Sequence, residues 1–305
     1  AIYVWTDTAL FTQRFVGQPF TFAFAQVGTN CGLAGQNACV EVDGAAYWMS
    51  ENGFFRYGGK LESLPCLVED HVYDDINLAS GNQMVSAGLN NLFGEIIWFY
   101  PSSTSDVVNK MVAYNYFDSS IKRPVWTVGT LARTMWRDSA VFGKPHALEY
   151  DASTDTSFDV VGNTEGRTAY YEHETGTDQN KNGTITAVLS NISSGDYDIT
   201  QRTLRGLGGV ADFRGDGEHI MKIRRFVPDF ISQTGTTRIT LQLKNYPNST
   251  QGSSPLGPFD ITTSTTKVDT RARARAISLK IENTAVDQSW KLGTFRLDVQ
   301  PDGRR

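Results

Sequence analysis

The chain of 305 residues has few cysteines and lacks any long apolar run. Cys31, Cys39 and Cys66 are a sparse, odd set with no CxxC spacing and no histidine nearby, which disfavours zinc. We expect free thiols, although Cys31 and Cys39 could pair across the loop "CGLAGQNAC". No run approaches the roughly 18 apolar residues that a membrane span needs. The length still allows a sizeable core, in one large β-domain or two ordinary ones.

Recognisable catalytic motifs are also missing. None of the four histidines lies in HExxH or beside a GxSxG elbow, and "GLGG" does not follow the GxGxxG pattern. In "YYEHETG", Glu172 and Glu174 would share one face of a strand without His173. That arrangement favours an exposed or interfacial strand over a metal or acid–base site.

A pair of carboxylates remains as the alternative catalytic hypothesis. A glycosidase needs two of them about 5 to 10 Å apart, and Asp74 or Asp75 with the distant Glu95 could supply them only if folding brings them together. Nothing in the sequence selects that pair. We therefore predict no enzymatic activity and no cofactor.

Helical periodicity is scarce, whereas strand signals are frequent. Aromatic and β-branched runs such as "IYVWT", "AAYWMS", "EIIWFY" and "TRITLQLKNY" alternate with turn-forming residues. Only residues 81–92 could carry a short helix. The sequence predicts an all-β fold.

A weak repeat points to a β-propeller. Trp5, Trp48 and Trp98 lie on hairpin strands spaced by about the 40 to 50 residues of a propeller blade. We predict a hairpin-rich, propeller-like region over 1–175 and a second β-region over 176–305, where loops become rich in Gly, Asn, Ser and Pro. The second region is either a separate sheet or sandwich, or the part that closes the same propeller. A pair of β-sandwiches is the alternative architecture.

One segment resembles half of a calcium loop. In "DQNKNG", Asp178, Asn180 and Asn182 precede Gly183 as oxygen ligands would at positions 1, 3 and 5. Position 12 is Leu189 instead of a glutamate. A plain hairpin turn is therefore favoured over a metal site.

The charge is mildly acidic, with a formal net charge of −5, which disfavours nonspecific duplex binding through a basic surface. Against this background, "DTRARARAISLKIEN" sets Arg271, Arg273 and Arg275 at a period of two, on one face of a predicted strand. Ile277 and the aliphatic residues after it continue the pattern. The strand is expected to leave an exposed or interfacial edge and enter a core.

Several blocks, in this order, resemble the packaged-DNA stabilisation proteins of tailed phages, which form the tail hub or nozzle. They are "EIIWFYPS", "VAYNYFD", "WTVGTLARTMWRD", "YYEHETG", "RRFVPDF" and "RARARAISLKIE" with "WKLGTFRLDVQPDGRR". The resemblance implies a non-enzymatic virion protein containing a β-propeller, in a sixfold ring below the portal. Its implied partners are copies of itself, a portal or head–tail adaptor, tail fibres or spikes, and the packaged DNA that passes through its lumen. The family usually carries further N-terminal sequence, so strands from that segment are expected to be missing here.

The resemblance suggests a role for the arginines. In a ring, Arg271, Arg273 and Arg275 could pair with carboxylates of a neighbouring subunit or adaptor. Alternatively they are solvated side chains that protect an edge strand from aggregation. A receptor- or glycan-binding propeller is the competing function, and it requires exposed aromatic platforms at residues such as Trp48 and Trp98.

Overall fold

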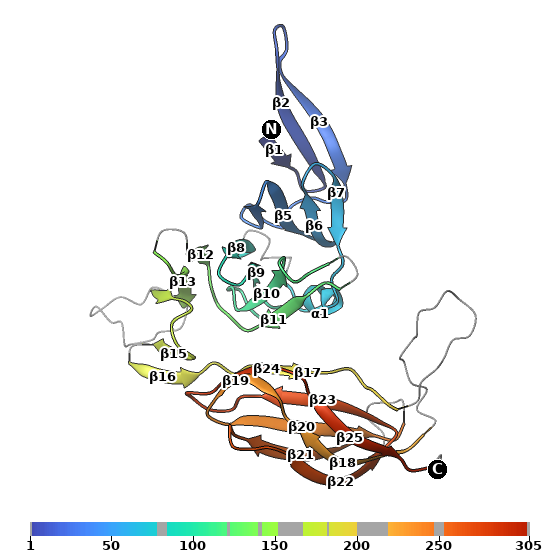
Figure 1. The fold of residues 1–305 in the computed structure, drawn as a ribbon. Coiled ribbons are helices and arrows are strands. Elements are labelled where there is room, and N and C mark those ends of the chain that lie inside the picture. The colour runs from blue at the N-terminus through green and yellow to red at the C-terminus, as the bar shows by residue number, and fades with distance from the viewer. Residues whose placement is uncertain are drawn as a thin grey trace, which may run out of the picture. The chain divides into compact units, whose positions relative to one another are not determined.

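The computed structural model describes residues 2–77, 84–120, 123–139, 142–151, 167–181, 183–199, 219–246 and 253–303 (Figure 1). Over these residues the chain forms antiparallel strands β1 to β25 and one short helix, α1 (Glu69–Tyr73). The predicted all-β fold is confirmed. No helix in the described ranges is long and apolar enough to cross a membrane.

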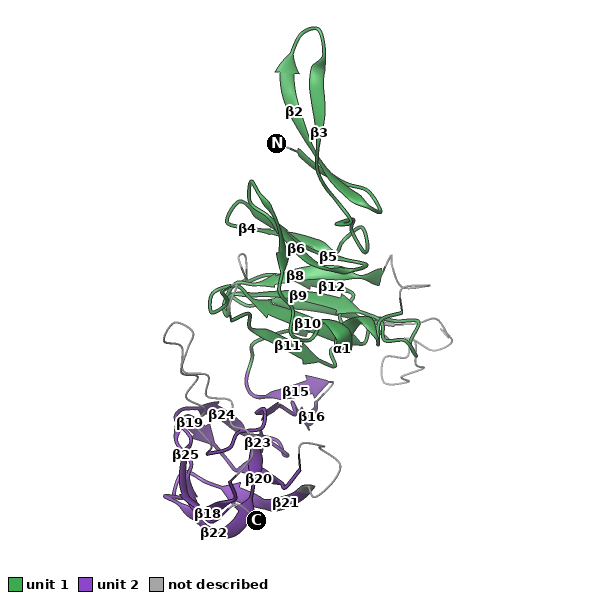
Figure 2. Cartoon of the chain, turned by 90° about the vertical axis from the view of Figure 1, so that its right-hand side faces the viewer, with its two compact units in different colours: residues 1–175 green, residues 176–305 purple. Residues whose placement is uncertain are grey.

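The chain divides into two compact units, Ala1–Thr175 and Gly176–Arg305 (Figure 2). The division falls where the loops become rich in Gly, Asn, Ser and Pro. Each unit has hydrophobic clusters of its own.

Unit 1 consists of consecutive sheets in which strands follow one another in chain order, and the two complete four-stranded meanders have the topology of propeller blades. The first sheet contains β1 (Ile2–Trp5), β2 (Ala9–Gly17) and β3 (Thr21–Thr29). The second contains β4 (Cys39–Val42), β5 (Ala45–Ser50), β6 (Gly53–Tyr57) and β7 (Leu61–Leu64). The third contains β8 (Ser86–Asn90), β9 (Glu95–Tyr100), β10 (Lys110–Asn115) and β11 (Trp126–Gly129). The fourth contains β12 (Met135–Arg137), β13 (His146–Asp151) and β14 (Arg167–Glu172).

These sheets pack face to face, so the middle ones are buried on both sides. Along β5, Trp48 joins a cluster with Leu10 of the first sheet, whereas Met49 joins a cluster with Trp98 of the third. Along β9, Phe99 packs on the opposite side, against Trp136 of the fourth sheet. A strand covered on both faces needs continuous apolar sequence, which is why "AAYWMS" and "EIIWFY" do not alternate.

The tryptophan repeat has a structural counterpart in the two complete sheets. Trp48 and Trp98 each occupy the second strand of a four-stranded meander and are fully buried. Each indole N–H donates to a backbone carbonyl, of Cys31 at 2.9 Å and of Ala38 at 3.0 Å respectively. Trp5 differs, because it lies on an edge strand and its Nε1 has no hydrogen-bond partner in the described part of the chain.

Unit 2 is a β-sandwich with a flanking hairpin. One sheet has the order β17 (Asn191–Ser193), β23 (Ala276–Glu282), β20 (Thr237–Lys244) and β21 (Ser253–Ile261). The facing sheet has the order β22 (Val268–Ala274), β18 (Met221–Val227) and β25 (Arg296–Pro301). The remaining pairs are β19 (Phe230–Thr234) with β24 (Ser289–Leu292), and β15 (Asp178–Lys181) with β16 (Thr184–Ala187). Phe226 of the second sheet and Ile239 of the first belong to one buried cluster between them.

Candidate functional site

The outer surface of the β22–β18–β25 sheet carries a concentration of positive charge in this acidic chain. Strict alternation places Ala272 and Ala274 in the core and Arg271 and Arg273 in solvent. We call the exposed basic residues of β18 and β22 on this surface the arginine face: Lys222, Arg224, Arg225, Arg271 and Arg273. β22 is an edge strand, as the sequence predicted.

An irregular register brings extra cations to this face. The pairing of β18 with β22 and with β25 shifts between Ile223 and Arg225, so Arg224 and Arg225 are both exposed. A β-bulge of this kind turns consecutive side chains toward the same side of a sheet. The bulge is held by Thr270, whose hydroxyl donates to the Ile223 carbonyl at 2.8 Å.

Only part of the positive charge is neutralised within the chain. Arg225 lies between Asp269 and Asp298, with nitrogen–oxygen distances of 3.7 and 3.4 Å, and Arg273 pairs with Asp302 at 2.5 Å. By contrast, Lys222, Arg224 and Arg271 make no side-chain ion pair or hydrogen bond with the described part of the chain. These unpaired cations are available to an acidic partner.

Arg275 differs from the two arginines before it. β22 ends at Ala274 and β23 begins at Ala276, so Arg275 occupies the bend where the chain crosses between the facing sheets. Its backbone N–H donates to the Lys244 carbonyl at 3.0 Å. Because the sheets face each other, the crossing exchanges the buried parity: even-numbered residues are buried in β22, but Ile277 and the odd-numbered residues after it are buried in β23.

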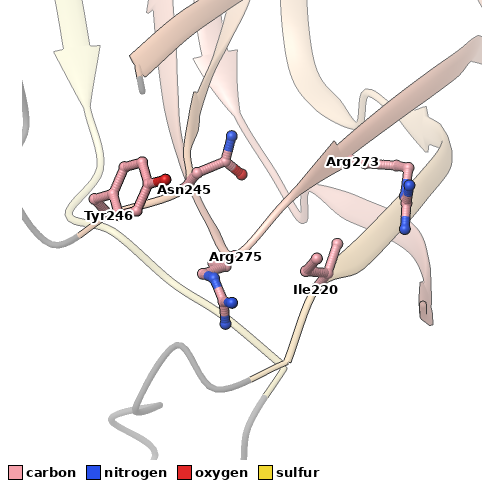
Figure 3. A pocket seen from close by; sticks show the side chains of 5 residues that line it. All are labelled: Ile220, Asn245, Tyr246, Arg273 and Arg275. Carbon is pink, nitrogen blue, oxygen red and sulfur yellow. The ribbon is translucent and has the colours of Figure 1, made fainter. Parts of the chain in front are cut away.

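A shallow pocket of about 330 Å³ lies beside this bend (Figure 3). Arg273 and Arg275 line it from the β22–β23 segment, together with Ile220, Asn245 and Tyr246. Tyr246 is mostly exposed. The pocket therefore combines two guanidinium groups with an accessible aromatic ring at the end of the sandwich.

A second unusual surface lies on unit 1, and it was not predicted from the sequence. β1 accompanies β2 only as far as Gln13, so the rest of the β2–β3 hairpin is a two-stranded ribbon. We call residues 14–25 the aromatic ribbon. Its exposed apolar side chains are Phe15, Val16, Phe20, Phe22 and Phe24, and the phenylalanines are 49% to 78% exposed.

The area of this apolar surface is large for a chain without a partner. At 150 to 250 Å² per aromatic side chain, four phenylalanines so exposed present on the order of 500 Å². That equals the largest apolar patch of a typical monomer, and such patches are often functional. In the sequence, Phe20, Phe22 and Phe24 alternate as the apolar residues of a half-buried strand do, and this alternation could have indicated an apolar surface here. The alternation does not reveal that no sheet of the described chain covers them.

The calcium-loop candidate lies in the β15–β16 hairpin. Asn180 Oδ1 accepts the Gly183 N–H at 2.9 Å across the turn, and Asp178 Oδ2 accepts the Asp287 N–H at 2.7 Å. Asn182 lies outside the described residues. The two described candidates thus serve the turn and a backbone contact. No three His, Cys, Asp or Glu residues gather as metal ligands in the described ranges.

The "YYEHETG" segment encloses a buried ionic cluster. Arg133, 4% exposed, donates through Nη1 to Glu149 and through Nε to His173 Nε2, each at 2.9 Å. Its guanidinium also lies 4.0 Å from the ring centre of Tyr171. Burial, reinforced by the Arg133 charge, lowers the pKa of His173 to about 4. The histidine is therefore a neutral acceptor that orients Arg133. Glu172 points elsewhere and pairs with Lys144 at 3.1 Å.

The carboxylates considered for glycoside hydrolysis do not face each other. Asp75 accepts a hydrogen bond from Ser103, just beyond the end of β9, whereas Glu95 begins that strand. The intervening length of β9 is roughly 16 Å at about 3.3 Å per residue. Asp74 follows directly after helix α1.

The aromatic residues considered for glycan binding are mostly in the core. Trp48 and Trp98 are 0% exposed and Tyr100 is 1% exposed. Trp5 is partly buried against Trp48. These side chains therefore offer no open platform for a sugar. The three cysteines are free thiols.

Comparison with known proteins gives little further guidance. No protein-family model matches the chain, and no curated protein matches it. Among solved structures, one match is an exo-beta-1,3-galactanase from Phanerochaete chrysosporium with galactose, at a TM-score of 0.28 and 9% identity. That match covers 95% of this chain and 75% of the galactanase. A score this low does not show a shared fold, so nothing is transferred from it.

Proposed function

We propose that the chain is a non-enzymatic structural subunit of a bacteriophage tail, the hub or nozzle that forms a sixfold ring below the portal. The ring retains the packaged DNA and conducts it during ejection. Self-association builds the ring, and the portal or adaptor and the tail fibres or spikes attach to it. The basis for the phage assignment is the ordered series of sequence blocks described above.

The observation that carries an assembly role is that each unit presents an unpartnered surface. The aromatic ribbon of unit 1 exposes about as much apolar area as a monomer usually tolerates. The arginine face of unit 2 holds Lys222, Arg224 and Arg271 without acidic partners in the described chain. A subunit repeated by symmetry buries such surfaces at every contact.

The net charge supports a conduit that does not hold DNA tightly. A duplex binds a protein chiefly through phosphate contacts with lysine and arginine, and the chain has a formal net charge of −5. In this proposal the arginine face therefore binds carboxylates of a neighbouring protein, and the lumen of the ring is acidic or neutral.

Electron microscopy of the purified chain and of the particle that contains it tests this proposal. A sixfold ring on the tail axis is the expected result. Location on peripheral fibres or spikes would contradict the hub and favour receptor binding.

A charge-reversal variant tests the arginine face. Arg271→Glu with Arg273→Glu should abolish ring formation, while Lys291→Glu changes an exposed cation outside the face and should leave the ring intact. Equal ring formation by both variants would refute the interface.

A further inference from the structure

Two carboxylates that form no ion pair with the described residues lie at the turn end of the β8–β9 hairpin in unit 1. Asn90 and Glu95 are register partners across the hairpin, so their side chains share one face of the sheet. Glu174, which follows β14, approaches the same place, and Asn90 Nδ2 donates to Glu174 Oε1 at 3.0 Å. Asn90 and Glu95 belong to the third sheet, whereas Glu174 lies just after the last strand of the fourth.

The amide oxygen of Asn90 is the atom that points to a ligand. Asn90 is 2% exposed, and its buried Oδ1 has no hydrogen-bond partner among the residues that the structure describes. A buried polar atom left unsatisfied destabilises the fold, because it has lost its hydrogen bonds to water. Oδ1 and Nδ2 of Asn90 belong to the same amide group, so the oxygen lies near the Glu174 carboxylate that Nδ2 contacts. The carboxylates beside it are acceptors too, so a cation or an additional donor is needed to satisfy it.

The local charge favours a cation over a neutral donor. Glu95 and Glu174 form no ion pair with any described residue. Glu95 is partly buried and lies within the electrostatic influence of Glu174, so the two carboxylates repel each other unless a cation lies between them. Asp138 contacts the adjacent turn, where its Oδ1 accepts the Asn91 N–H at 3.1 Å, but it is not a third carboxylate ligand.

We propose that Asn90 Oδ1 and the carboxylates of Glu95 and Glu174 form a binding site for a hard divalent cation, with Ca²⁺ as the preferred ion. Carboxylate and amide oxygens are its usual ligands, and its flexible coordination accepts water in the remaining positions. Mg²⁺ demands a stricter octahedron and fits this set less well. The ion links the segment after β14 to the β8–β9 hairpin. The inference is independent of the proposed tail function.

Terbium luminescence on the full chain, freed of metal with a chelator, tests the site. Tb³⁺ substitutes for Ca²⁺, and two aromatic side chains are close enough to sensitise its emission. Trp136 donates to the Leu89 carbonyl, next to Asn90, and Tyr116 donates to Asn91. We expect saturable emission that Ca²⁺ displaces, with a dissociation constant of about 0.1 to 1 mM, as in weak calcium modules.

Matched variants assign the ligands. Glu174→Gln and Glu95→Gln should each weaken Ca²⁺ binding at least about tenfold, which corresponds to a loss of one ligand charge. Glu172→Gln removes a nearby carboxylate that pairs with Lys144, and it should leave the affinity unchanged. Glu174 is exposed, so its variant is expected to fold, and circular dichroism verifies both variants.

Two results would overturn the site. One is the absence of displaceable Tb³⁺ emission at millimolar Ca²⁺, combined with a more stable Glu95→Gln protein. That outcome means Glu95 itself carries a proton and satisfies the Asn90 oxygen. The other is an affinity that Glu174→Gln does not alter.

Discussion

Arg133 is a buried cation of unit 1, and replacing it with methionine should destabilise that unit strongly. Its side chain is 5% exposed, and that of its partner Glu149 is 16% exposed. Removing one member of a buried ion pair leaves the other charge uncompensated, which costs about 3 to 5 kcal/mol. Arg133→Met also removes the hydrogen bond to His173 and the contact with Tyr171. The loss is a large fraction of the 5 to 15 kcal/mol that stabilises a typical domain.

Urea unfolding followed by tryptophan fluorescence measures this loss. Five of the six tryptophans belong to unit 1, so the signal reports mainly on that unit. Replacing both partners, with Arg133→Met and Glu149→Leu, should recover most of the stability because no buried charge remains unpaired. Arg137→Met is the matched control, since Arg137 is exposed on the neighbouring strand, and should change stability by less than about 0.5 kcal/mol.

A loss below about 1 kcal/mol for Arg133→Met would refute the argument, because it would mean that Glu149 is solvated. If the double variant does not recover stability, the loss arises from the missing contacts with His173 and Tyr171 and not from the unpaired Glu149 carboxylate.

Three further predictions concern pH, the aromatic ribbon and packing. The unfolded chain protonates His173 near its ordinary pKa of 6.5, whereas burial lowers the pKa in the folded chain to about 4. The free energy of unfolding of unit 1 should therefore fall by about 1 to 2 kcal/mol as the pH falls from 6.5 to 4. The His173→Gln variant should lose less stability over the same range, as urea midpoints measured at the two pH values would show. A variant with Phe20→Ser and Phe22→Ser should unfold at an unchanged urea concentration but sediment as a smaller species than the wild type, whereas an unchanged oligomer would contradict the ribbon as an interface. A Cβ atom at Gly32 would collide with the Asp7 carbonyl in the β1–β2 turn, so Gly32→Ala should lower the free energy of unfolding by about 2 kcal/mol or more, as measured by calorimetry. Gly195→Ala is the control: its Cβ atom would meet open space, so its stability should hardly change.

Local pattern was sufficient for much of the fold. Alternation in "RARARA" correctly predicted Arg271 and Arg273 outside and the alanines between them inside an edge strand, because side chains of a strand point to opposite faces, but it wrongly placed Arg275 in the same row. Continuous apolar runs such as "AAYWMS" are typical of strands covered on both sides. Neither pattern states which sheet covers which face.

The candidate sites were harder to predict, because their residues come together only through tertiary packing. Glu174 and Asn90 are 84 positions apart, and Arg133 and His173 are 40 apart. The sequence of "YYEHETG" suggested an exposed strand, yet His173 is held by an arginine from another segment. Conversely, alternating phenylalanines such as those of the aromatic ribbon are typical of a half-buried strand, but in the described chain this strand has no covering sheet.

By itself the sequence determined the all-β class, the position of the strands and the sidedness of β22, because these depend on period-two patterning and turn chemistry over a few residues. Only the tertiary structure decided that Arg275 leaves the arginine row at a sheet crossing and that Trp48 and Trp98 are core residues. It also decided that the Asn90 oxygen, which has no partner among the described residues, lies near two carboxylates. Such outcomes depend on which distant faces meet, and local periodicity carries no information about that choice.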